Sequence, residues 1–367
     1  MNEQATNRRA VMLSGSIGFG HDQLAEACAT TLEAEGWTTR RLDLMRLLGR
    51  GADSIADGVF RSMLAVPGVF DAFHFSALRD GNRLADLTDT AATRRIIPRL
   101  RKELDDHPAD LAISVFSTGA SAFSKIAPLY RSMKHVVFST DVTPHRLWVH
   151  PDVDLYLVTS EVAERAVRRF QPDARVLVVQ APVREPFYHP PTQQAARDSF
   201  GVPPRDRCVL LTTGAWGLGP VAQAAEALGD AGVHVLAVAG RNPKLEQRLR
   251  TVADRQPLVQ PFGFTDRIPD LMAASDLVIT SSGDTCTEAR VIGRPLLLLD
   301  VVQGHGRDNL QHELELGDAA VASGRAADVV RATLAALENA KPPPAVPTRS
   351  RDAWHSALTA ALATIGL

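Results

Sequence analysis

The chain has 367 residues, of which 45% are hydrophobic, so it is long enough to form two domains with a core each. Lysine and arginine number 40 against 42 aspartate and glutamate residues, which gives a formal net charge of −2. A balance so close to neutral excludes a global attraction for nucleic acid or anionic lipid. Three scattered cysteines, Cys28, Cys208 and Cys286, show no metal-ligand spacing and favour a reduced, cytoplasmic compartment.

The sequence predicts neither a targeting signal nor a membrane span. Residues 1–10 are polar, and the apolar run after them is too short for the core of a signal peptide. No stretch approaches the ~18 apolar residues of a transmembrane helix. We therefore expect a cytoplasmic protein that is either soluble or attached peripherally to the inner face of the membrane.

Each half of the chain begins with the same short pattern. Strand-like residues 11–13 lead into a GxxGxG loop at 15–20, and residues 208–211 lead into another at 214–219. An alanine-rich helix follows each loop, and finding this unit twice predicts two doubly wound α/β domains in tandem. The glycines of the two loops are Gly15, Gly18, Gly20, Gly214, Gly217 and Gly219.

Further strands alternate with helices along both halves, which predicts a parallel sheet in each. In the first half we expect a helix at 21–35, with Gly36 as its stop signal. The other expected strands of this half are 38–44, 111–115, 135–139 and 155–159. Those of the second half are 208–213, 233–239, 258–260, 277–280 and 296–300.

The proline distribution indicates where the domains end. Residues 186–205 are rich in proline and are predicted to link an N-terminal domain at 1–185 to a C-terminal domain at 206–345. A second proline cluster precedes a last helix, which we expect within the segment 346–367.

Two neighbouring polar loops in residues 276–309 indicate a ligand site. A strand at 277–279 stops at a Ser-Ser-Gly-Asp-Thr loop, from which a helix carrying Glu288 starts, and a second strand ends at a glycine-rich loop. Ligands of open α/β sheets bind beyond the carboxyl ends of the strands, and a helix N-terminus suits a phosphate. Glu288 is placed to accept hydrogen bonds from a ribose diol. These groups suit a nucleotide diphosphate, although an ordinary βαβ unit with Gly283 as a turn residue has the same pattern.

Residues 276–309 also resemble the donor-nucleotide segment of a glycosyltransferase family. Its members are related to monogalactosyldiacylglycerol synthase, the processive diacylglycerol glucosyltransferases and the MurG enzyme of peptidoglycan synthesis. In that family a glycine-rich loop precedes a Thr-x-x-Glu-Ala helix, as in residues 283–289. The resemblance implies the GT-B fold, in which two Rossmann-like domains face each other across a cleft and the last helix crosses back to the first domain. The other matching stretches are 14–27, 139–161, 212–219, 239–242 and 263–280.

The resemblance places the sugar nucleotide mostly on the C-terminal domain. There the glycine loop, the helix start after Gly283 and a cation would stabilise the diphosphate. Arg241 leads as that cation, with His305 and Arg307 behind it. Phe264 lies where family members clamp uracil, while Phe262 fits a core position better. The donor-binding residues implied in this way are Gly214, Gly217, Gly219, Arg241, Phe264, Gly283, Asp284, Thr285, Glu288, Gly304, His305, Gly306 and Asn309.

Two departures from the family pattern fall on the donor loops. Residues 303–306, Gln-Gly-His-Gly, stand where many members have Pro-Gly-Gln-Glu, which leaves the identity of the sugar open. Asp284 stands where a second glycine is usual. Its negative charge near the phosphates either weakens binding or caps the helix.

His21 and Asp141 are the candidate catalytic residues. His21 follows the first glycine loop at a helix N-terminus, where the dipole favours the neutral imidazole, and Asp141 follows a predicted strand. A helix-capping histidine and a turn aspartate are the structural alternatives. By resemblance, both face the reacting centre and Asp141 is the commoner candidate for the general base. The acceptor-side residues expected nearby are Gly18, Gly20, His145, Phe70 and Phe73.

Two competing motifs are rejected. A dinucleotide enzyme would use GxGxxG rather than GxxGxG, although Asp43 could mimic its ribose acid. Asp152-Val153-Asp154 matches the metal-binding DxD signature of another transferase fold, but its apolar surroundings indicate the entrance to a strand. We therefore expect no required metal, and no cofactor apart from a UDP-sugar co-substrate.

Residues 44–78 carry more apolar side chains than a connecting helix needs, with arginines interspersed. Such a segment can lie in a headgroup interface, and in the lipid-acceptor relatives the corresponding region approaches the bilayer. The alternative is that these side chains fill the core or a dimer interface. We expect the segment to be partly mobile, to line the cleft near His21 and Asp141 and to bind liposomes weakly.

Taken with the resemblance, these features predict an inverting, metal-independent glycosyltransferase. It would move a hexose from a UDP-sugar to a lipid or other hydrophobic acceptor, with a membrane surface but no nucleic acid as a partner. The alternatives are a nucleotide-sugar epimerase of the same fold and a non-catalytic UDP-sugar sensor. The sequence leaves open the sugar, the acceptor, the oligomeric state and whether Asp141 or His21 is the base.

Overall fold

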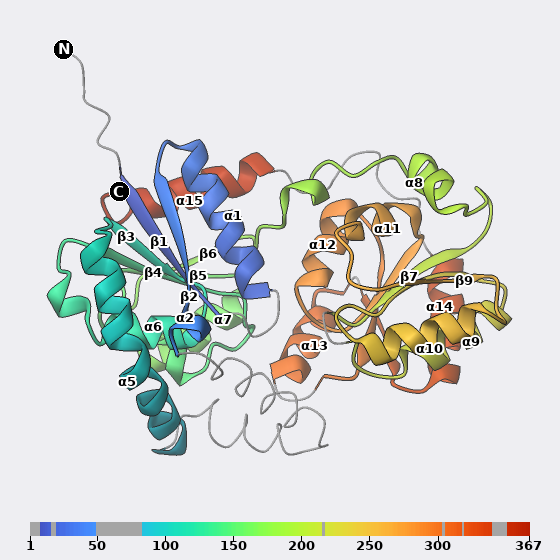
Figure 1. The fold of residues 1–367 in the computed structure, drawn as a ribbon, viewed down its shortest axis with the longest axis horizontal. Coiled ribbons are helices and arrows are strands. Elements are labelled where there is room, and N and C mark those ends of the chain that lie inside the picture. Colours follow the sequence, from blue (N-terminus) through green and yellow to red (C-terminus); the bar gives the residue numbers. More distant parts are fainter. Residues whose placement is uncertain are drawn as a thin grey trace, which may run out of the picture. The chain divides into compact units, whose positions relative to one another are not determined.

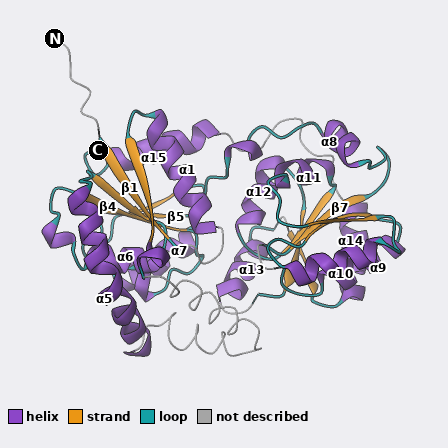
Figure 2. Cartoon of the chain, in the orientation of Figure 1, coloured by secondary structure: helices purple, strands orange, loops and turns teal. Residues whose placement is uncertain are grey.

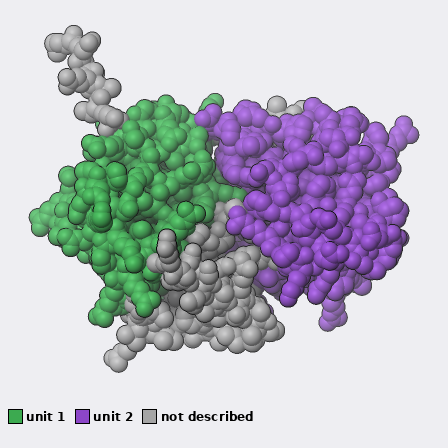
Figure 3. Space-filling model, in the orientation of Figure 1, with its two compact units in different colours: residues 1–182, 352–367 green, residues 183–351 purple. Residues whose placement is uncertain are grey.

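The computed structural model describes residues 8–15, 20–48, 83–214, 217–302, 305–317, 319–339 and 351–367. It divides into two compact units, which Figure 3 colours separately. Unit 1 contains residues 1–182 together with 352–367, and unit 2 contains residues 183–351.

Unit 1 is built on a parallel sheet of six strands in the order β2-β1-β3-β4-β5-β6 (Figure 1). The strands are β1 (Arg9–Ser14), β2 (Thr38–Asp43), β3 (Leu111–Ser114), β4 (Lys134–Ser139), β5 (Leu155–Val158) and β6 (Val176–Val178). The helices are α1 (Gly20–Ala34), α2 (Leu44–Leu47), α5 (Arg83–Asp106), α6 (Ser117–Ser124), α7 (Glu161–Phe170) and α15 (Arg351–Ala363), with short 3₁₀ turns η2 (Ala127–Leu129) and η3 (Arg146–Trp148).

The core of unit 1 lies on both faces of this sheet because side chains alternate along each strand. Met12 joins one buried cluster with α1 and α15, whereas its neighbours Val11 and Leu13 join another with α5 and α6. Helices therefore cover both faces, as Figure 2 shows.

Unit 2 repeats the design with the strand order β12-β11-β10-β7-β8-β9. Its strands are β7 (Cys208–Thr212), β8 (His234–Val238), β9 (Val259–Phe262), β10 (Leu277–Thr280), β11 (Leu296–Asp300) and β12 (Ala319–Ser323). Its helices are η4 (Glu185–Phe187), α8 (Gln193–Phe200), α9 (Val221–Asp230), α10 (Pro243–Ala253), α11 (Ile268–Ala274), α12 (Asp284–Ile292), α13 (His305–Glu315) and α14 (Ala326–Glu338). The prediction of two doubly wound α/β domains is confirmed.

The segment 186–205, expected to be a linker, instead contains α8 and belongs to unit 2. A buried ion pair holds it there: both Nη2 contacts of Arg197 to the Asp276 carboxylate measure 2.8 Å. Asp276 precedes β10 and also accepts from the backbone N–H of Cys208, at 2.9 Å, so α8 is fixed to two strands. The prolines of this segment lie around α8 rather than in an open linker.

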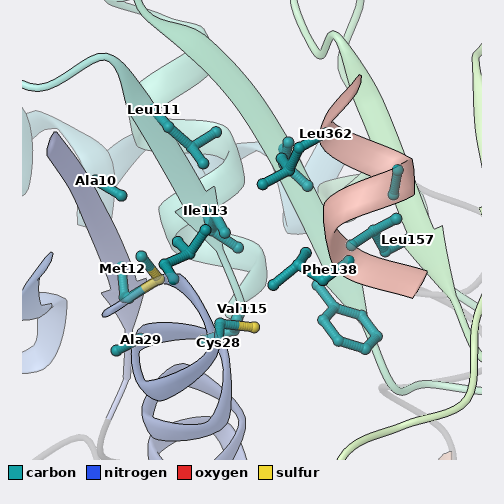
Figure 4. Close-up of a cluster of buried hydrophobic side chains, with 14 of the residues drawn as sticks. Ala10, Met12, Cys28, Ala29, Leu111, Ile113, Val115, Phe138, Leu157 and Leu362 are labelled. Atoms are coloured by element: carbon teal, nitrogen blue, oxygen red, sulfur yellow. The ribbon is translucent and has the colours of Figure 1, made fainter. Parts of the chain in front are cut away.

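Helix α15 packs into the core of unit 1, although it follows unit 2 in the sequence. Trp354 stacks on Phe138 with ring centroids 5.5 Å apart, and its indole N–H donates to Thr31 of α1 at 2.8 Å. Leu362, from the same helix, lies beside the strand residues Ile113 and Leu157 in Figure 4. Among the described residues, no helix has both the length and the apolar character needed to cross a bilayer.

Candidate functional site

The first strand of each unit lies inside its sheet, and this position creates a switch point. In unit 1 the chain order reverses between β1 and β3, and in unit 2 between β7 and β10. Loops that follow the strands on either side of such a point diverge and leave room for a ligand at the carboxyl edge. Both glycine loops predicted from the sequence follow these inner strands.

At the carboxyl edge of the unit 1 sheet, three polar or aromatic side chains come together. His21 lies in the first turn of α1 after β1, Phe116 follows β3, and Asp141 follows β4. The His21 and Phe116 rings meet edge to face, with centroids 5.1 Å apart. Because β1, β3 and β4 are adjacent and parallel, residues more than a hundred positions apart reach one place.

Trp148 of η3 joins these residues into one cluster. Its indole N–H donates to Oδ2 of Asp141 at 2.8 Å, and the backbone N–H of Asp141 donates to Oγ of Ser139 at 3.3 Å. The Trp148 ring lies 6.4 Å from the His21 ring and 6.3 Å from the His145 ring. We call His21, Asp141, His145 and Trp148 the Trp148 cluster. The sequence places Trp148 close behind Asp141 but gives no signal of this contact.

The loop between β1 and α1 tolerates no side chain at Gly15. A Cβ atom built there would lie 2.5 Å from the Phe116 ring, which fills that space and packs on His21. On the other side of the loop, Ser14 donates to the Asp22 carboxylate at 2.9 Å, which ties the end of β1 to the first turn of α1. These contacts fix the position of His21.

The predicted acceptor-side residues are only partly described. His145 belongs to the Trp148 cluster, and Gly20 is the first residue of α1. Gly18, Phe70 and Phe73 lie outside the described residues, as does the segment 44–78 beyond residue 48. The mobility and site contacts expected for that segment therefore stay predictions.

The rejected motifs have structural roles. Asp43 caps α2 by accepting from the backbone N–H of Met45 at 2.9 Å. Asp154 pairs with Lys134 at 3.0 Å and also accepts from the His135 backbone, before β5 begins. That position is at the edge of the sheet opposite the Trp148 cluster, as expected for the entrance to a strand. Among the described residues, no group of His, Cys, Asp and Glu is arranged to hold a metal ion.

In unit 2 the glycine loop after β7 has the conformation that its residues allow. Gly214, Gly217 and Gly219 have φ values of 75°, 57° and 85°, a region that side chains disfavour. A Cβ atom at Gly217 would lie 2.3 Å from Leu245, and one at Gly219 would lie 2.8 Å from Val301. Gly217 and Gly219 are therefore packed closely against their neighbours.

Helix α12 begins at the same switch point, after β10. Gly283 occupies its N-cap in an extended conformation, and no side chain within the described residues caps the helix. Asp284 and Thr285 form its first turn. Ser282 donates to the carbonyl oxygen of Gly306 at 2.7 Å and so ties this loop to the one after β11. The exposed N–H groups of α12 suit an anion, although Asp284 adds a negative charge beside them.

Glu288 lies one turn into α12 and is buried, with 7% of its surface exposed. Burial raises the pKa of its carboxyl to about 8, an effect that the positive charge of Arg184 opposes and the negative charge of Asp284 reinforces. Arg184 precedes η4, with its guanidinium 5.2 Å from the Phe187 ring. Its buried Nε has no hydrogen-bond partner in the described part of the chain. Arg184 could not be predicted as a site residue because it stands between prolines, in a stretch without periodicity.

Arg241 and Phe264 meet at the surface of unit 2. The Arg241 guanidinium lies 4.8 Å from the centre of the Phe264 ring, and 53% of the surface of Phe264 is exposed. Phe262, in contrast, packs on Phe200 in the core, with ring centroids 5.7 Å apart. An exposed aromatic ring held by a cation is a ready stacking surface.

The remaining predicted donor residues lie at the start of α13. Gly306 and Asn309 belong to this helix, and a Cβ atom at Gly306 would lie 2.3 Å from Val302. Gly304 and the side chain of His305 lie outside the described residues.

All three cysteines are buried, and burial raises the pKa of each thiol to about 12, so none is a reactive thiolate.

Two family models match the two halves of the chain. The model described as monogalactosyldiacylglycerol (MGDG) synthase matches residues 21–183, and the model described as glycosyltransferase family 28 C-terminal domain matches residues 213–336. Over both halves, this chain is therefore similar to the MGDG synthase family of glycosyltransferases. The resemblance read from the sequence motifs is thereby confirmed. The Trp148 cluster lies in the first matched region, and the loops around α12 lie in the second.

Curated relatives match most of this chain. A probable monogalactosyldiacylglycerol synthase of Nicotiana tabacum is 34% identical over 332 residues, which are 86% of this chain and 62% of that protein. A processive diacylglycerol β-glucosyltransferase of Bacillus pumilus (strain SAFR-032) is 25% identical over 358 residues, which are 91% of this chain and 88% of that protein. The chain thus spans less than two thirds of the plant protein and most of the bacterial one.

Solved structures share the fold at low sequence identity. MurG of Acinetobacter baumannii gives a TM-score of 0.56 at 14% identity, covering 95% of this chain and 93% of that one. A putative UDP-N-acetylglucosamine 2-epimerase of Listeria monocytogenes gives a TM-score of 0.60 at 15% identity, covering 98% of this chain and 97% of that one. The two-domain fold is common to both, so the fold alone does not separate a transferase from an epimerase.

The buried Glu288 generates a prediction about stability. The pKa of this carboxyl is 4.5 in the unfolded chain and about 8 in the folded protein, so the folded state binds the proton more tightly. The stability of the wild-type protein therefore falls as the pH rises between these two values. Glu288→Gln stays neutral throughout. The melting temperature of the variant relative to wild type should therefore increase between about pH 5 and about pH 8.5.

Thermal unfolding followed by circular dichroism measures this difference. Glu226→Gln is the control, because Glu226 is exposed and pairs with Arg255 at 2.7 Å. The difference in melting temperature between this variant and the wild type should stay constant over that pH range. A constant difference for Glu288→Gln across the range would show that Glu288 is not held in its neutral form.

Proposed function

We propose that this protein transfers a hexose from a UDP-sugar to a hydroxyl of a diacylglycerol-like or other hydrophobic acceptor. The transfer would invert the anomeric centre and need no metal ion. The proposal is supported by the match to the MGDG synthase family model and by relatives that are named for galactosyl or glucosyl transfer to diacylglycerol. The chain alone does not identify the sugar.

The observation that carries the proposal is the convergence of His21 and Asp141 on Trp148 at the switch point of unit 1. A carboxylate at this edge can take the proton of the acceptor hydroxyl. As that proton moves to Asp141, the acceptor oxygen bonds to the anomeric carbon, whose bond to the diphosphate breaks and releases UDP. In the proposed reaction His21, placed in the first turn of α1, helps to orient the acceptor.

The donor groups of the proposal belong to unit 2. The N–H groups at the start of α12 and the backbone of the Gly214–Gly219 loop would bind the diphosphate, with Arg241 as the cation. Glu288 would accept hydrogen bonds from the ribose, with Arg184 favouring its ionised form. Phe264 offers a surface for the uracil ring.

Two alternatives share the donor site. A nucleotide-sugar epimerase needs no acceptor, and a sensor binds the sugar nucleotide without reaction. Incubation with a panel of UDP-sugars separates the three functions. Slow release of UDP indicates a transferase, a new sugar nucleotide indicates an epimerase, and binding without conversion indicates a sensor.

For the donor, we expect UDP to raise the melting temperature in the absence of magnesium. Above the pKa of about 8, where the Glu288 carboxyl is ionised, Glu288→Ala removes charge-assisted hydrogen bonds worth roughly 1.5–3 kcal/mol, so UDP affinity at about pH 9 should fall tenfold or more. Isothermal titration calorimetry measures the change, with Glu226→Ala as an exposed control that leaves affinity unaltered. Unchanged UDP binding in Glu288→Ala would contradict the ribose assignment.

For catalysis, Asp141→Asn should keep UDP affinity and lose most turnover, since only the transition state needs the proton removed. His21→Ala should lower the rate as well, through the reacting centre. Turnover with a radiolabelled UDP-sugar and a lipid extract provides the measurement. Near-normal turnover in Asp141→Asn combined with an inactive His21→Ala would assign the base to His21 instead.

Peripheral membrane binding is the remaining part of the proposal, and the solvent side of α5 supports it. Arg94, Arg95, Arg99 and Arg101 are exposed there and form what we call the α5 basic face. Arg99 donates to the carbonyl oxygen of Leu47 at 2.5 Å, but no carboxylate among the described residues pairs with any of the four. In a chain of net charge −2, this is a local concentration of positive charge suited to an anionic lipid surface.

We therefore expect the protein to sediment weakly with anionic liposomes, less so at high salt. Arg94→Glu combined with Arg95→Glu should reduce sedimentation and leave UDP binding intact. The control is Lys244→Glu with Arg248→Glu on α10, which changes the net charge equally from exposed positions. If the wild-type protein does not sediment with liposomes of any composition, the proposed acceptor becomes a soluble alcohol or a natural-product aglycone.

A further inference from the structure

Asp141 is held at two points, one on its backbone and one on its side chain. The backbone N–H donates to Oγ of Ser139 at 3.3 Å, and Oδ2 accepts from the indole N–H of Trp148 at 2.8 Å. An indole nitrogen can only donate, so Oδ2 serves Trp148 as an acceptor. The second contact restricts rotation of the carboxylate about its terminal torsion, which is otherwise broad and poorly defined.

Trp148 is itself fixed in the core of unit 1. Only 2% of its surface is exposed, and it belongs to a buried cluster with Val137 and Tyr156. Its backbone N–H donates to the carbonyl oxygen of His145 at 2.9 Å, and η3 packs against α6. The indole therefore connects a rigid core to a half-buried carboxylate at the site.

We infer that Trp148 is a positioning residue that gives the two carboxylate oxygens of Asp141 different roles. Oδ2 anchors the carboxylate on the indole, and Oδ1 receives the proton of the acceptor hydroxyl. The inference rests on the proposed function, in which Asp141 is the base. The proton moves to Oδ1 as the acceptor oxygen bonds to the anomeric carbon and UDP leaves, while the bond from Trp148 to Oδ2 persists throughout.

The chain offers a matched control for this contact. Trp354 is also a buried tryptophan of unit 1, with 4% of its surface exposed, and its indole N–H donates to Oγ1 of Thr31 at the same 2.8 Å. It has no contact with the Trp148 cluster in the described residues. Trp148→Phe and Trp354→Phe each remove one indole hydrogen bond of equal length, so a general loss of stability is expected in both variants.

Steady-state kinetics with a UDP-sugar and a lipid acceptor compare the two variants. A misplaced base costs turnover rather than donor binding, so Trp148→Phe should lower kcat about tenfold to a hundredfold with little change in KM for the UDP-sugar. Trp354→Phe should keep the wild-type kcat at temperatures where both variants are folded. Equal kcat values for the two variants would overturn the inference.

A spectroscopic measurement tests the contact independently of activity and of the folding of Trp148→Phe. The chain has four tryptophans, so replacing Trp37, Trp216 and Trp354 in turn assigns the Trp148 indole N–H resonance by elimination. In Asp141→Asn the charged acceptor becomes neutral, and the Trp148 resonance should shift while that of Trp354 stays in place. An unshifted Trp148 resonance would also overturn the inference.

These outcomes differ from those that would defeat the proposed function. An absence of transfer by wild-type protein, or full turnover in Asp141→Asn, would remove Asp141 as the base even if the indole resonance shifts. Loss of turnover in Asp141→Asn with normal kcat in Trp148→Phe would keep the function and reject the role of Trp148.

Discussion

In a parallel sheet every strand ends at the same edge, and the positions of the polar groups in both units follow from this constraint. The inner strands β1 and β7 place their glycine loops at a switch point, where loops on either side diverge. The remaining strands bring Asp141 and the start of α12 to those same edges. Each unit can therefore have a polar site on a largely apolar sheet, because the site lies at the carboxyl edge and the core lies on the two faces.

Strands that are apolar throughout could be predicted from the sequence. The strands β3, β5, β7, β10 and β11 lie within a residue or so of their expected ends. The edge strands β6 and β12 were missed because β6 has only three residues and β12 is mostly alanine, which is a weak strand former. The linker prediction was wrong because proline content outweighed two helix signals, Thr192 as the N-cap of α8 and Gly201, at φ 66°, as its stop.

The candidate site was predictable in its members but not in its contacts. The sequence motifs identify His21 and Asp141 as candidates. Their contacts with Trp148 depend on the order of the strands in the sheet, which the spacing of residues along the chain does not reveal. The burial of Glu288 was also unforeseen. A glutamate one turn into a helix is usually exposed, whereas Glu288 is buried, and the contact of η4 with α12 brings the charge of Arg184 to bear on it.

The crossing of α15 into unit 1 has a consequence for the order in which the protein forms during synthesis. Unit 2 is continuous in sequence, whereas the core of unit 1 needs Trp354, Leu358 and Leu362, which the ribosome delivers after all of unit 2. Domains usually fold in the order in which they emerge. Here the second unit can reach its native state while the first still exposes the apolar face that α15 covers, so the half bearing Asp141 is the last to close.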